Sequence, residues 1–343
     1  MKPIQIVGGG LAGLSLGIAL RQGGAPVAIT EAGSYPRHRV CGEFISGQGR
    51  AVLRQLGLEE KLRARGAREA VTAAFYGART DMPPRPLPEP ALCLSRFDLD
   101  QCLADEFRQL GGVLTENTRW REPWGDGIVR ATGRSPAKST AGWRWFGLKV
   151  HARGVPLAAD LEMHLQPDGY VGLCRLDAQT VNVCGLFRTR AAIPHLARNW
   201  RQWLEGPANS ILRRRLADAQ YDESSFCSTA GLNLAAQRAA DHAECRIGDA
   251  ITMISPMTGN GMSMAFEAAG LAAKQLFDYS AGRLAWPEAA ARTARAIDVQ
   301  FRRRLAWGAR LQNAAFRPRW GEALLRLAGR SPFLWRHMFQ RTR

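Results

Sequence analysis

The 343-residue chain lacks the features that mark several common protein classes. It has no run of about 18 uninterrupted apolar residues, so it offers no membrane-spanning helix. Its seven cysteines are odd in number and form no CxxC pair, which favours reduced thiols over a disulfide framework or a zinc site. Glycines interrupt the apolar amino-terminal stretch, which argues against a signal peptide. We therefore expect a cytoplasmic, globular protein without a metal.

Acidic residues are scarce relative to basic ones. The chain has 47 Lys and Arg against 30 Asp and Glu, a net charge of +17. A field of this sign attracts anionic partners such as nucleic acid, acidic lipid or nucleotide phosphates. The arginines are scattered, however, and no zinc-finger or RNA-recognition signature accompanies them. We therefore expect no nucleic-acid binding.

Alternating β-rich and helical segments are typical of an α/β protein. Residues 3–7 (PIQIV) are β-rich, residues 11–24 repeat apolar residues at helical spacing, and residues 26–30 (PVAIT) predict the next strand. Together they form a β-α-β unit. From about 147 to 190, strands separated by turns predict a mostly antiparallel sheet. The length fits one α/β body with a second lobe.

Other segments have clear local preferences. Residues 50–66 predict an amphipathic helix pair and residues 71–77 a strand. Residues 82–91 (MPPRPLPEPA) predict a loop, because prolines lack the backbone donor that a central strand or a helix requires. Residues 195–220 and the basic segment from about 287 onward predict helices.

A glycine-rich turn follows the first strand. In GxGxxG spacing, Gly8 permits a tight turn, Gly10 lets the backbone approach a pyrophosphate, and Gly13 lets the helix pack close to its strand. Glu31 stands at the end of the second strand, where a carboxylate can accept hydrogen bonds from a ribose. The strand, turn, helix and acid agree on a dinucleotide site. Its predicted contacts in the turn are Gly8, Gly10, Leu11, Ala12 and Gly13.

A second glycine turn lies near the other end, in CRIGDAITMISPMTGNGMSMAFEAAG (245–270). Asp249, at a strand end, can bind the polyol of a ribityl chain. The turn from Gly259 through Gly261 to Met262 opens a helix whose free N–H groups would stabilise negative charge on a reduced flavin. The two turns together therefore favour a flavin nucleotide.

This second segment resembles the superfamily of geranylgeranyl reductases, aromatic-ring flavoprotein monooxygenases and flavin-dependent halogenases. There, a strand ending in GDA is followed by P-x-x-G-x-G-x-x-x-A, matched here by Gly248, Asp249, Ala250, Pro256, Gly259, Gly261 and Ala265. The resemblance implies a Rossmann-like FAD-binding domain of the p-hydroxybenzoate-hydroxylase-like type, a mostly antiparallel substrate sheet and carboxyl-terminal helices. It also implies bound FAD and transient NADPH or NADH.

This fold implies a discontinuous division of the chain. We expect the FAD-binding domain at 1–70, 95–146 and 226–285, the substrate domain at 71–94 and 147–225, and basic helices at 286–343.

The segment PRHRVCGEF (36–44) resembles the P-R-x-K-x-C-G-G stretch of geranylgeranyl reductases and the R-x-x-x-G-E-S loop of halogenases. The match implies that Arg39 lies near the FAD and Cys41 near the isoalloxazine ring, where Cys41 is the candidate catalytic residue. Glu43 departs from the reductase pattern, because it replaces the second glycine.

Two further segments resemble the superfamily. SRFDLDQCL (95–103) matches a helix start whose arginine sits over the FAD, which implies that role for Arg96; a surface salt bridge is the alternative. ATGRSP (131–136) resembles the strand-end turn that passes under the flavin, where Gly133 would permit a close approach.

The sequence indicates the type of reaction less specifically than it indicates the cofactor. Halogenation is set aside, because GWRWFGLKV (142–150) lacks the Ile-Pro of the halogenase W-x-W-x-x-I-P motif and lysines are few. We favour monooxygenation of a small lipophilic or aromatic molecule, polyketide- or isoprenoid-like. The alternative enzyme is a reductase or dehydrogenase of carbon-carbon double bonds. A non-catalytic FAD-fold binding subunit is the alternative of another class.

Histidines and the tail complete the candidates. His38, His151 and His164 fit surface or satisfied histidines better than acid or base catalysts, although the last two lie in the expected substrate sheet. The tail interleaves arginines with aromatics. It fits either peripheral contact with an anionic membrane or, as we prefer, a helical cap on the FAD domain with arginine stems over the aromatics.

Overall fold

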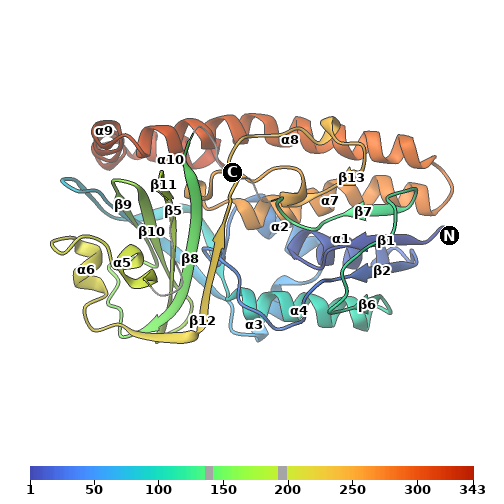
Figure 1. The fold of residues 1–343 in the computed structure, drawn as a ribbon, viewed down its shortest axis with the longest axis horizontal. Helices are drawn as coiled ribbons and strands as arrows, with labels where there is room; N and C mark the ends of the chain where they lie inside the picture. Colours follow the sequence, from blue (N-terminus) through green and yellow to red (C-terminus); the bar gives the residue numbers. More distant parts are fainter. Residues whose placement is uncertain (136–141, 192–198) are drawn as a thin grey trace.

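Two β-sheets stand side by side beneath one long helix in the computed structural model, which describes residues 1–135, 142–191 and 199–343 (Figure 1). The first sheet is parallel, in the order β13-β7-β1-β2-β6. Its strands are β1 (Ile4–Val7), β2 (Val27–Thr30), β6 (Val113–Thr115), β7 (Ile128–Arg130) and β13 (Cys245–Arg246).

Three helices pack around the parallel sheet, namely α1 (Leu11–Gln22), α4 (Arg96–Gln109) and α7 (Gly261–Ser280). Their apolar stripes meet the strands in one core, in which Ile6, Leu14 and Phe266 are fully buried. The unit β1-α1-β2 pairs Ile4 with Val27 in parallel register. The predicted β-α-β unit and the fold class are therefore confirmed.

The second sheet is antiparallel except where β4 pairs with β9, and its order is β12-β8-β11-β10-β9-β4-β5-β3. Its strands are β3 (Phe44–Ile45), β4 (Arg68–Tyr76), β5 (Asp81–Cys93), β8 (Arg144–Arg153), β9 (Leu161–Gln166), β10 (Gly169–Arg175), β11 (Thr180–Thr189) and β12 (Gln220–Ala230). Phe146, Val171 and Phe187 form its buried core with Trp200 and Leu204.

The proline-rich segment corrects one prediction. It belongs to β5, not to a loop. Among the described strands, β5 pairs along this segment only with β4, because the two-residue β3 pairs with the far end of β5 at Leu92 and Cys93. Prolines are tolerated where a strand presents its donors to no neighbour, so the absence of a central strand was correctly inferred and the loop was wrong.

The remaining short helices connect these layers. They are α2 (Gln48–Gln55), α3 (Glu59–Ala64), α5 (Trp200–Leu204), α6 (Ile211–Arg215), η1 (Ala239–Asp241), η2 (Gly248–Ala250) and η3 (Pro256–Thr258). The helix pair expected at 50–66 is confirmed. The helical prediction for 195–220 holds for α5 and α6, while residues 195–198 lie outside the described residues. Strand β12 was not predicted.

The chain closes with α8 (Trp286–Ala315), α9 (Pro318–Arg330) and α10 (Pro332–Arg341). Helix α8 packs on α7, as the predicted cap on the FAD domain requires. Helices α9 and α10 instead cover β5: Trp335 Nε1 donates to Pro86 O at 3.2 Å, and Arg85 donates to Gly329 O. The cap prediction is therefore wrong for α9 and α10, which shield the edge of the second sheet.

Within the described ranges, no helix is both long and apolar enough to cross a membrane. All seven cysteines are unbridged. The predicted domain division stays a prediction.

Candidate functional site

The first glycine turn joins β1 to α1 and leaves space for a ligand. A side chain at Gly8, where φ is 108°, would meet Ala131 O at 2.3 Å, and one at Gly13 would meet Gly8 O at 1.9 Å. Both glycines therefore allow close packing. A Cβ at Gly10 would have no neighbour within 4 Å, and the amino end of α1 at Leu11 has no side-chain cap. This open, uncapped helix end suits a pyrophosphate.

Glu31 fixes the shape of that turn. Its Oε2 accepts a hydrogen bond from Gly9 N at 2.7 Å, and its Oε1 accepts from Gly33 N at 2.9 Å and Arg37 Nη1 at 2.8 Å. Burial raises the pKa of Glu31, but the arginine and the two N–H groups outweigh burial and lower it to about 2. The carboxylate is thus ionised. A ribose hydroxyl would donate to it in addition to Gly9 N, Gly33 N and Arg37, three donors that the sequence did not reveal.

Asp249 lies in η2, in a recess of the protein. Solvent reaches its side chain, and no hydrogen bond to it is found in the described part of the chain. Desolvation by the surrounding protein nevertheless raises its pKa to about 6, against the opposing charges of Arg96 and Arg134. The Asp249 carboxylate lies in a recess that solvent can reach, and it has no hydrogen-bond partner among the described residues. It is therefore suited to receive hydrogen bonds from a ligand polyol.

The second uncapped helix end belongs to α7. Gly259 has φ 63°, and a Cβ there would lie 2.2 Å from the Phe44 ring. A Cβ at Gly261 would have only Ile254 near it, at 4.0 Å, while Met262 is buried. Because α7 lacks a side-chain cap, its first N–H groups remain available to a negative charge.

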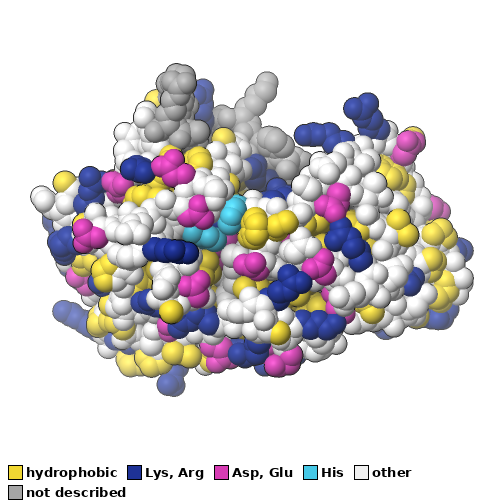
Figure 2. Space-filling view, turned by 90° about the horizontal axis from the view of Figure 1, so that it is seen from below, with side chains coloured by type: hydrophobic (Ala, Val, Ile, Leu, Met, Phe, Trp, Pro, Cys, Tyr) yellow, Lys and Arg dark blue, Asp and Glu magenta, His cyan; other side chains and the backbone are white. Residues whose placement is uncertain are grey.

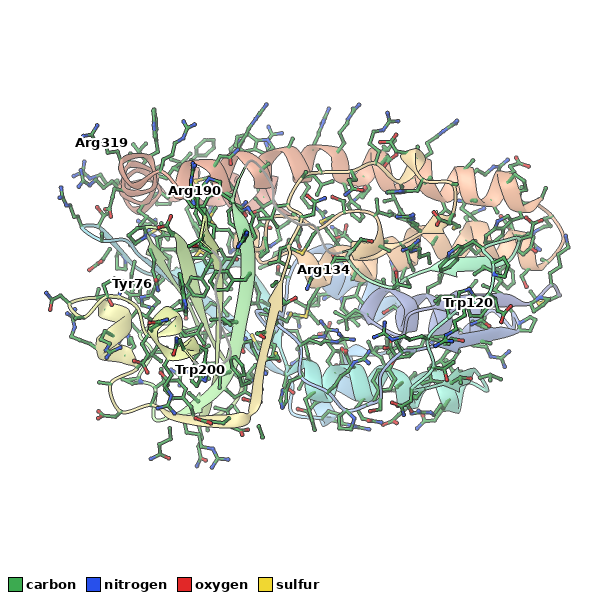
Figure 3. The ribbon with its side chains drawn as sticks, in the orientation of Figure 1. Tyr76, Trp120, Arg134, Arg190, Trp200 and Arg319 are labelled. Carbon is green, nitrogen blue, oxygen red and sulfur yellow. The ribbon has the colours of Figure 1, made fainter. Side chains whose placement is uncertain are left out.

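The turn after β7 adds a further wall. Gly133 has φ 73°, and a Cβ there would meet no atom within 4 Å, so a planar ligand could approach its backbone. Arg134 follows and donates to Ala230 O at 3.2 Å; burial lowers the pKa of Arg134. Figure 3 shows Arg134 at the junction of the two sheets. Pro136 of this predicted turn lies outside the described residues.

These walls fit FAD. The open space at Gly10 suits the pyrophosphate, the recess at Asp249 the ribityl chain, and the end of α7 the ring. The individual contacts remain predictions.

The loop between β2 and β3 carries Arg39 and Cys41. Solvent reaches the side chain of Arg39. Partial desolvation by the surrounding protein, followed by the positive charges of Arg37 and Arg96, lowers its pKa. Cys41 is half-buried, and burial raises its thiol pKa. A cysteine that stays protonated at neutral pH is a poor nucleophile, which argues against covalent catalysis by Cys41.

Arg96 begins α4 and is held by two carboxylates. Its guanidinium pairs with Asp100 at 2.7 and 2.8 Å, and its backbone N donates to Glu43 Oε1 at 2.8 Å. The salt bridge considered from the sequence therefore exists, but it is buried and not on the surface. Contact of Arg96 with FAD stays a prediction.

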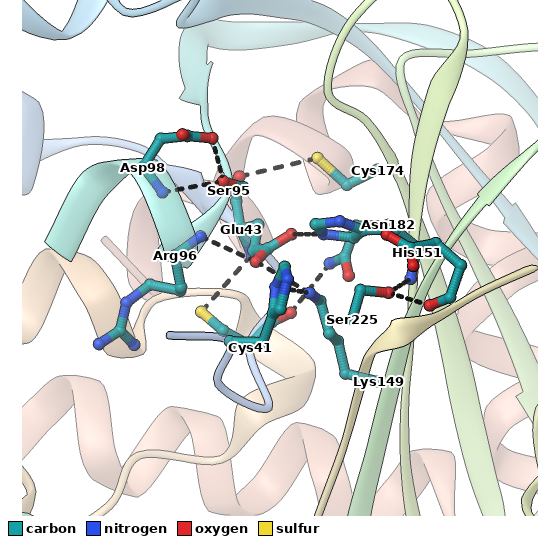
Figure 4. A network of polar contacts seen from close by, with 12 residues as sticks. Cys41, Glu43, Ser95, Arg96, Asp98, Lys149, His151, Cys174, Asn182 and Ser225 are labelled. Atoms are coloured by element: carbon teal, nitrogen blue, oxygen red, sulfur yellow. Dashed lines mark hydrogen bonds and ion pairs between the residues drawn. The ribbon is translucent and has the colours of Figure 1, made fainter. Parts of the chain in front are cut away.

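Glu43 is the centre of a buried polar cluster that the sequence did not reveal (Figure 4). The Glu43 and Lys149 side chains are fully buried, with Glu43 Oε1 3.5 Å from Lys149 Nζ. His151 Nε2 lies 2.7 Å from Glu43 Oε2, and Lys149 Nζ lies 3.0 Å from His38 Nδ1. Glu43 has φ 61°, so it occupies a glycine-like conformation, which agrees with the glycine that the reductase motif has there.

The negative charge of Glu43 is balanced by other residues of the same cluster. Burial raises the pKa of Glu43, but His151 and Lys149 outweigh it and lower the value. Burial and then Lys149 lower the pKa of His38 to about 4, so His38 is neutral at pH 7. Ligand atoms of His38, Glu43 and His151 lie within 4.8 Å of one another, yet the ammonium already supplies the cation there. Figure 2 shows histidine side chains reaching the surface near the middle of the face seen from below.

The third histidine is structural. His164 is buried, and its Nε2 lies 3.0 Å from Glu162 Oε2. Glu162 also pairs with Arg215 at 3.2 Å. His164 is therefore the satisfied histidine that we expected.

An apolar cavity of about 180 Å³ lies between the second sheet and the carboxyl-terminal helices. Strands β4, β9 and β10 form one wall, and α8, α9 and α10 form the other. It also reaches Gly42 of the Cys41 loop and Phe44 of β3, together with Met257 and Thr258 just before α7. The cavity therefore meets both segments predicted to flank the flavin ring, which suits a small lipophilic ligand.

Comparisons with known proteins agree with this geometry. Residues 1–142 match the family model of an FAD binding domain. A 73-residue stretch is 42% identical to squalene epoxidase 4 of Arabidopsis thaliana, which is 21% of this chain and 14% of that protein. The match thus spans a small part of the plant protein.

Solved structures share the fold across nearly the whole chain. The flavin-dependent brominase Bmp2 has a TM-score of 0.69 at 18% identity and covers 99% of this chain and 92% of its own. PqsL of Pseudomonas aeruginosa, in complex with 2-aminobenzoylacetate, has a TM-score of 0.71 at 17% identity and covers 94% and 98%. The FAD-binding fold predicted from the two glycine turns is confirmed.

Substitutions at Gly10 and Gly13 should have different effects, the first on FAD binding and the second on stability. Gly10→Val should fold normally but purify without FAD, because its side chain fills open space. Gly13→Ala should lose about 1–3 kcal/mol of stability, because its Cβ overlaps the Gly8 carbonyl. Urea unfolding and flavin absorbance measure both effects. Gly125→Val, another glycine with open space around its Cβ position, is the control; full flavin content in Gly10→Val would contradict the site.

Asp249 should lower the stability of the FAD-free protein and strengthen the binding of FAD. Its folded pKa of about 6 exceeds the ordinary 3.8, so stability of the FAD-free protein falls as pH rises from 3.8 to about 6 and stays reduced above. Asp249→Asn should therefore match or exceed the wild type in urea midpoint at pH 7.5 while binding FAD at least about tenfold more weakly. Asp249→Ala should be colourless. A lower midpoint with unchanged FAD affinity would show a purely structural aspartate.

Lys149→Met should be strongly destabilising. It leaves the buried Glu43 carboxylate without its ammonium partner, which costs about 3–5 kcal/mol. The double variant Glu43→Gln, Lys149→Met should recover part of that loss in urea unfolding. Lys274→Met, which removes an exposed lysine paired with Asp278, is the control and should change stability by less than about 1 kcal/mol. Equal losses in the two lysine variants would refute the cluster's charge balance.

Proposed function

We propose that this chain, a member of the FAD-dependent oxidoreductase superfamily, is a flavoprotein monooxygenase that acts on a small lipophilic or aromatic molecule, polyketide- or isoprenoid-like. One oxygen atom of O2 would enter the substrate and the other would leave as water: R–H + O2 + NAD(P)H + H⁺ gives R–OH + H2O + NAD(P)⁺. The apolar cavity that meets the Cys41 loop and the turn before α7 carries the proposal, because it would hold a lipophilic substrate beside the flavin.

Bound FAD would supply electron transfer from NAD(P)H and the reaction with O2. The chain's own residues would position it. Glu31 holds the pyrophosphate turn in shape, and Asp249 would accept hydrogen bonds from the ribityl chain. The amino end of α7 would favour negative charge on the reduced ring. The apolar side chains that line the cavity would lower the polarity around a bound substrate.

The relatives support oxygen transfer. Squalene epoxidase is by its name an epoxidase, and PqsL is seen with a small aromatic acid, 2-aminobenzoylacetate. Halogenation is less favoured despite the fold shared with Bmp2. A halogenase would need a lysine beside its substrate, but the buried Lys149 does not line the described cavity and is held between Glu43 and His38.

Double-bond reduction is the second candidate, favoured by one observation. Cys41 is a protonated thiol in the loop that reaches the cavity, and a hydride-transferring reductase needs a proton donor for the second carbon. A non-catalytic binding subunit is disfavoured, because the glycine turns, Glu31 and Asp249 are all in place.

The proposal also includes a cellular compartment and a membrane contact. The seven free cysteines suit a reducing compartment such as the cytoplasm. A lipophilic substrate would partition into membranes, which makes peripheral membrane contact of the basic carboxyl-terminal helices useful.

Oxygen labelling should separate the reactions. Purified protein with FAD, NADPH or NADH and a panel of lipophilic and aromatic compounds is incubated under ¹⁸O2, and products are analysed by mass spectrometry. One ¹⁸O atom per product, with one NAD(P)H consumed, is expected. A gain of two hydrogens without ¹⁸O would replace the proposal with the reductase.

Gly172→Val tests the cavity in the same assay. Gly172 pairs with Met163 on the cavity wall, and a Cβ there makes only ordinary contacts, with the nearest atom at 3.7 Å. The variant should keep its FAD but raise KM about tenfold for the larger substrates, because a branched side chain narrows the cavity. Unchanged KM for every substrate would place the substrate elsewhere.

A further inference from the structure

We infer that the outer surface of α9 and α10 binds anionic lipid bilayers, and that lipophilic substrate enters the cavity between these helices. The entry route rests on the proposed function, whereas bilayer binding does not. Three strongly exposed apolar residues (Trp320, Leu327, Phe333) and three exposed arginines (Arg319, Arg326, Arg330), here called the tail surface, carry the inference.

The exposed apolar residues of the tail surface lie on two neighbouring helices, α9 and α10. Trp320 is 63% and Leu327 57% exposed, and residues seven apart lie on the same face of α9. Phe333, 79% exposed, stands in the first turn of α10. Exposing two large aromatic side chains to water is costly, so a surface that presents them together with leucine is suited to an apolar environment.

The inner side of the same helices is also apolar. On α9, Gly321, Leu325 and Ala328 are buried at helical spacing. Gly321, Leu324 and Leu325 of α9 line the cavity, together with Trp335, Met338 and Phe339 of α10. A thin helical layer thus separates the tail surface from the substrate cavity, which is the arrangement that lipid entry requires.

The charge of this region selects the kind of lipid. Residues 299–343 contain eleven arginines and a single acidic residue, Glu322. Glu322 accepts a hydrogen bond from Arg79 N at 3.0 Å, so it is engaged with the body of the protein. Figure 3 shows Arg319 projecting outward from α9, and nitrogen-tipped side chains extend along the same upper edge. This sign favours anionic headgroups.

The arginines are placed as in an interfacial helix. Arg319, Arg326 and Arg330 are exposed and follow the spacing i, i+7, i+11, which puts them on one stripe beside the Trp320 and Leu327 stripe. Arg326 Nε donates to Thr80 Oγ1 at 3.0 Å, whereas the long stems of Arg319 and Arg330 allow their charged heads to reach phosphates while the neighbouring apolar residues enter the acyl boundary. Nucleic acid would use the arginines but would not require an exposed leucine.

The surface continues from α10 to α8. The rings of Phe333 and His337 stack at 6.2 Å, His337 meets Trp307 edge-on at 6.3 Å, and Arg310 lies 5.9 Å from the Trp307 ring. Within the tail surface, Phe333 is therefore held against packed side chains of α10 and α8.

Vesicle sedimentation tests the inference. FAD-loaded protein is mixed with vesicles of phosphatidylcholine alone or with equal phosphatidylglycerol, at about 0.15 M salt, the physiological ionic strength. The anionic vesicles should sediment the protein, and neutral vesicles should do so at least tenfold less. Trp320→Ser with Phe333→Ser, and separately Arg319→Glu with Arg326→Glu, should each lower the apparent affinity for anionic vesicles at least tenfold.

Val299→Ser is the matched control, because Val299 is a strongly exposed apolar residue of α8 outside the tail surface; it should bind like the wild type. No wild-type sedimentation, or equal sedimentation of all variants, would overturn the inference, as would equal affinity for neutral vesicles. Tighter binding to a duplex DNA that displaces the protein from vesicles would also overturn it. Flavin absorbance of the same samples reports separately on the FAD site, which vesicle binding leaves untouched.

Discussion

The Glu43 carboxylate is the contact on which the relation between the two sheets depends. One oxygen accepts the backbone N–H at the start of α4 and faces Lys149, and the other meets His151. Helix α4 belongs to the parallel sheet, whereas Lys149 and His151 belong to β8 of the other sheet. Because an unpaired buried carboxylate is expensive, any separation of the sheets would have to solvate or protonate Glu43. The loop that carries Cys41 is thereby fixed at the place where the cavity meets the cofactor walls.

The second sheet shows how an edge becomes part of a binding site. The prolines of β5 leave it a strand with few donors, and α9 and α10 cover its free side through Trp335 and Arg85. That cover is also the outer wall of the cavity. The chain therefore uses the same two helices to protect a sheet edge and to enclose apolar space, which connects the stability of the substrate lobe with the shape of its ligand site.

What the sequence could predict is what local rules determine. Gly8, Gly13 and Gly259 are placed by backbone geometry, and their spacing indicated the turns, the parallel unit and the FAD-binding fold. The Glu43 cluster joins residues more than a hundred positions apart, so no local pattern could reveal Lys149 as its partner. The proline rule was applied to β5 without knowing that, among the described residues, one side of this segment would face helices and not another strand. Strand β12 was missed because its alternation is weak, with mostly exposed side chains.

Asp249 shows why the cofactor and the fold are energetically linked. Unlike Glu43, it receives no compensating hydrogen bond from the described residues, and desolvation leaves its pKa at about 6. At neutral pH the Asp249 carboxylate is therefore ionised in spite of the desolvation cost, and hydroxyl donors of a polyol would offset that cost. Binding that relieves a cost of the free protein stabilises the folded state in addition to occupying a site. Asp249 thus lowers the stability of the FAD-free protein and raises its affinity for the cofactor. The buried Glu43 carboxylate is instead paired with the chain's own Lys149 and His151.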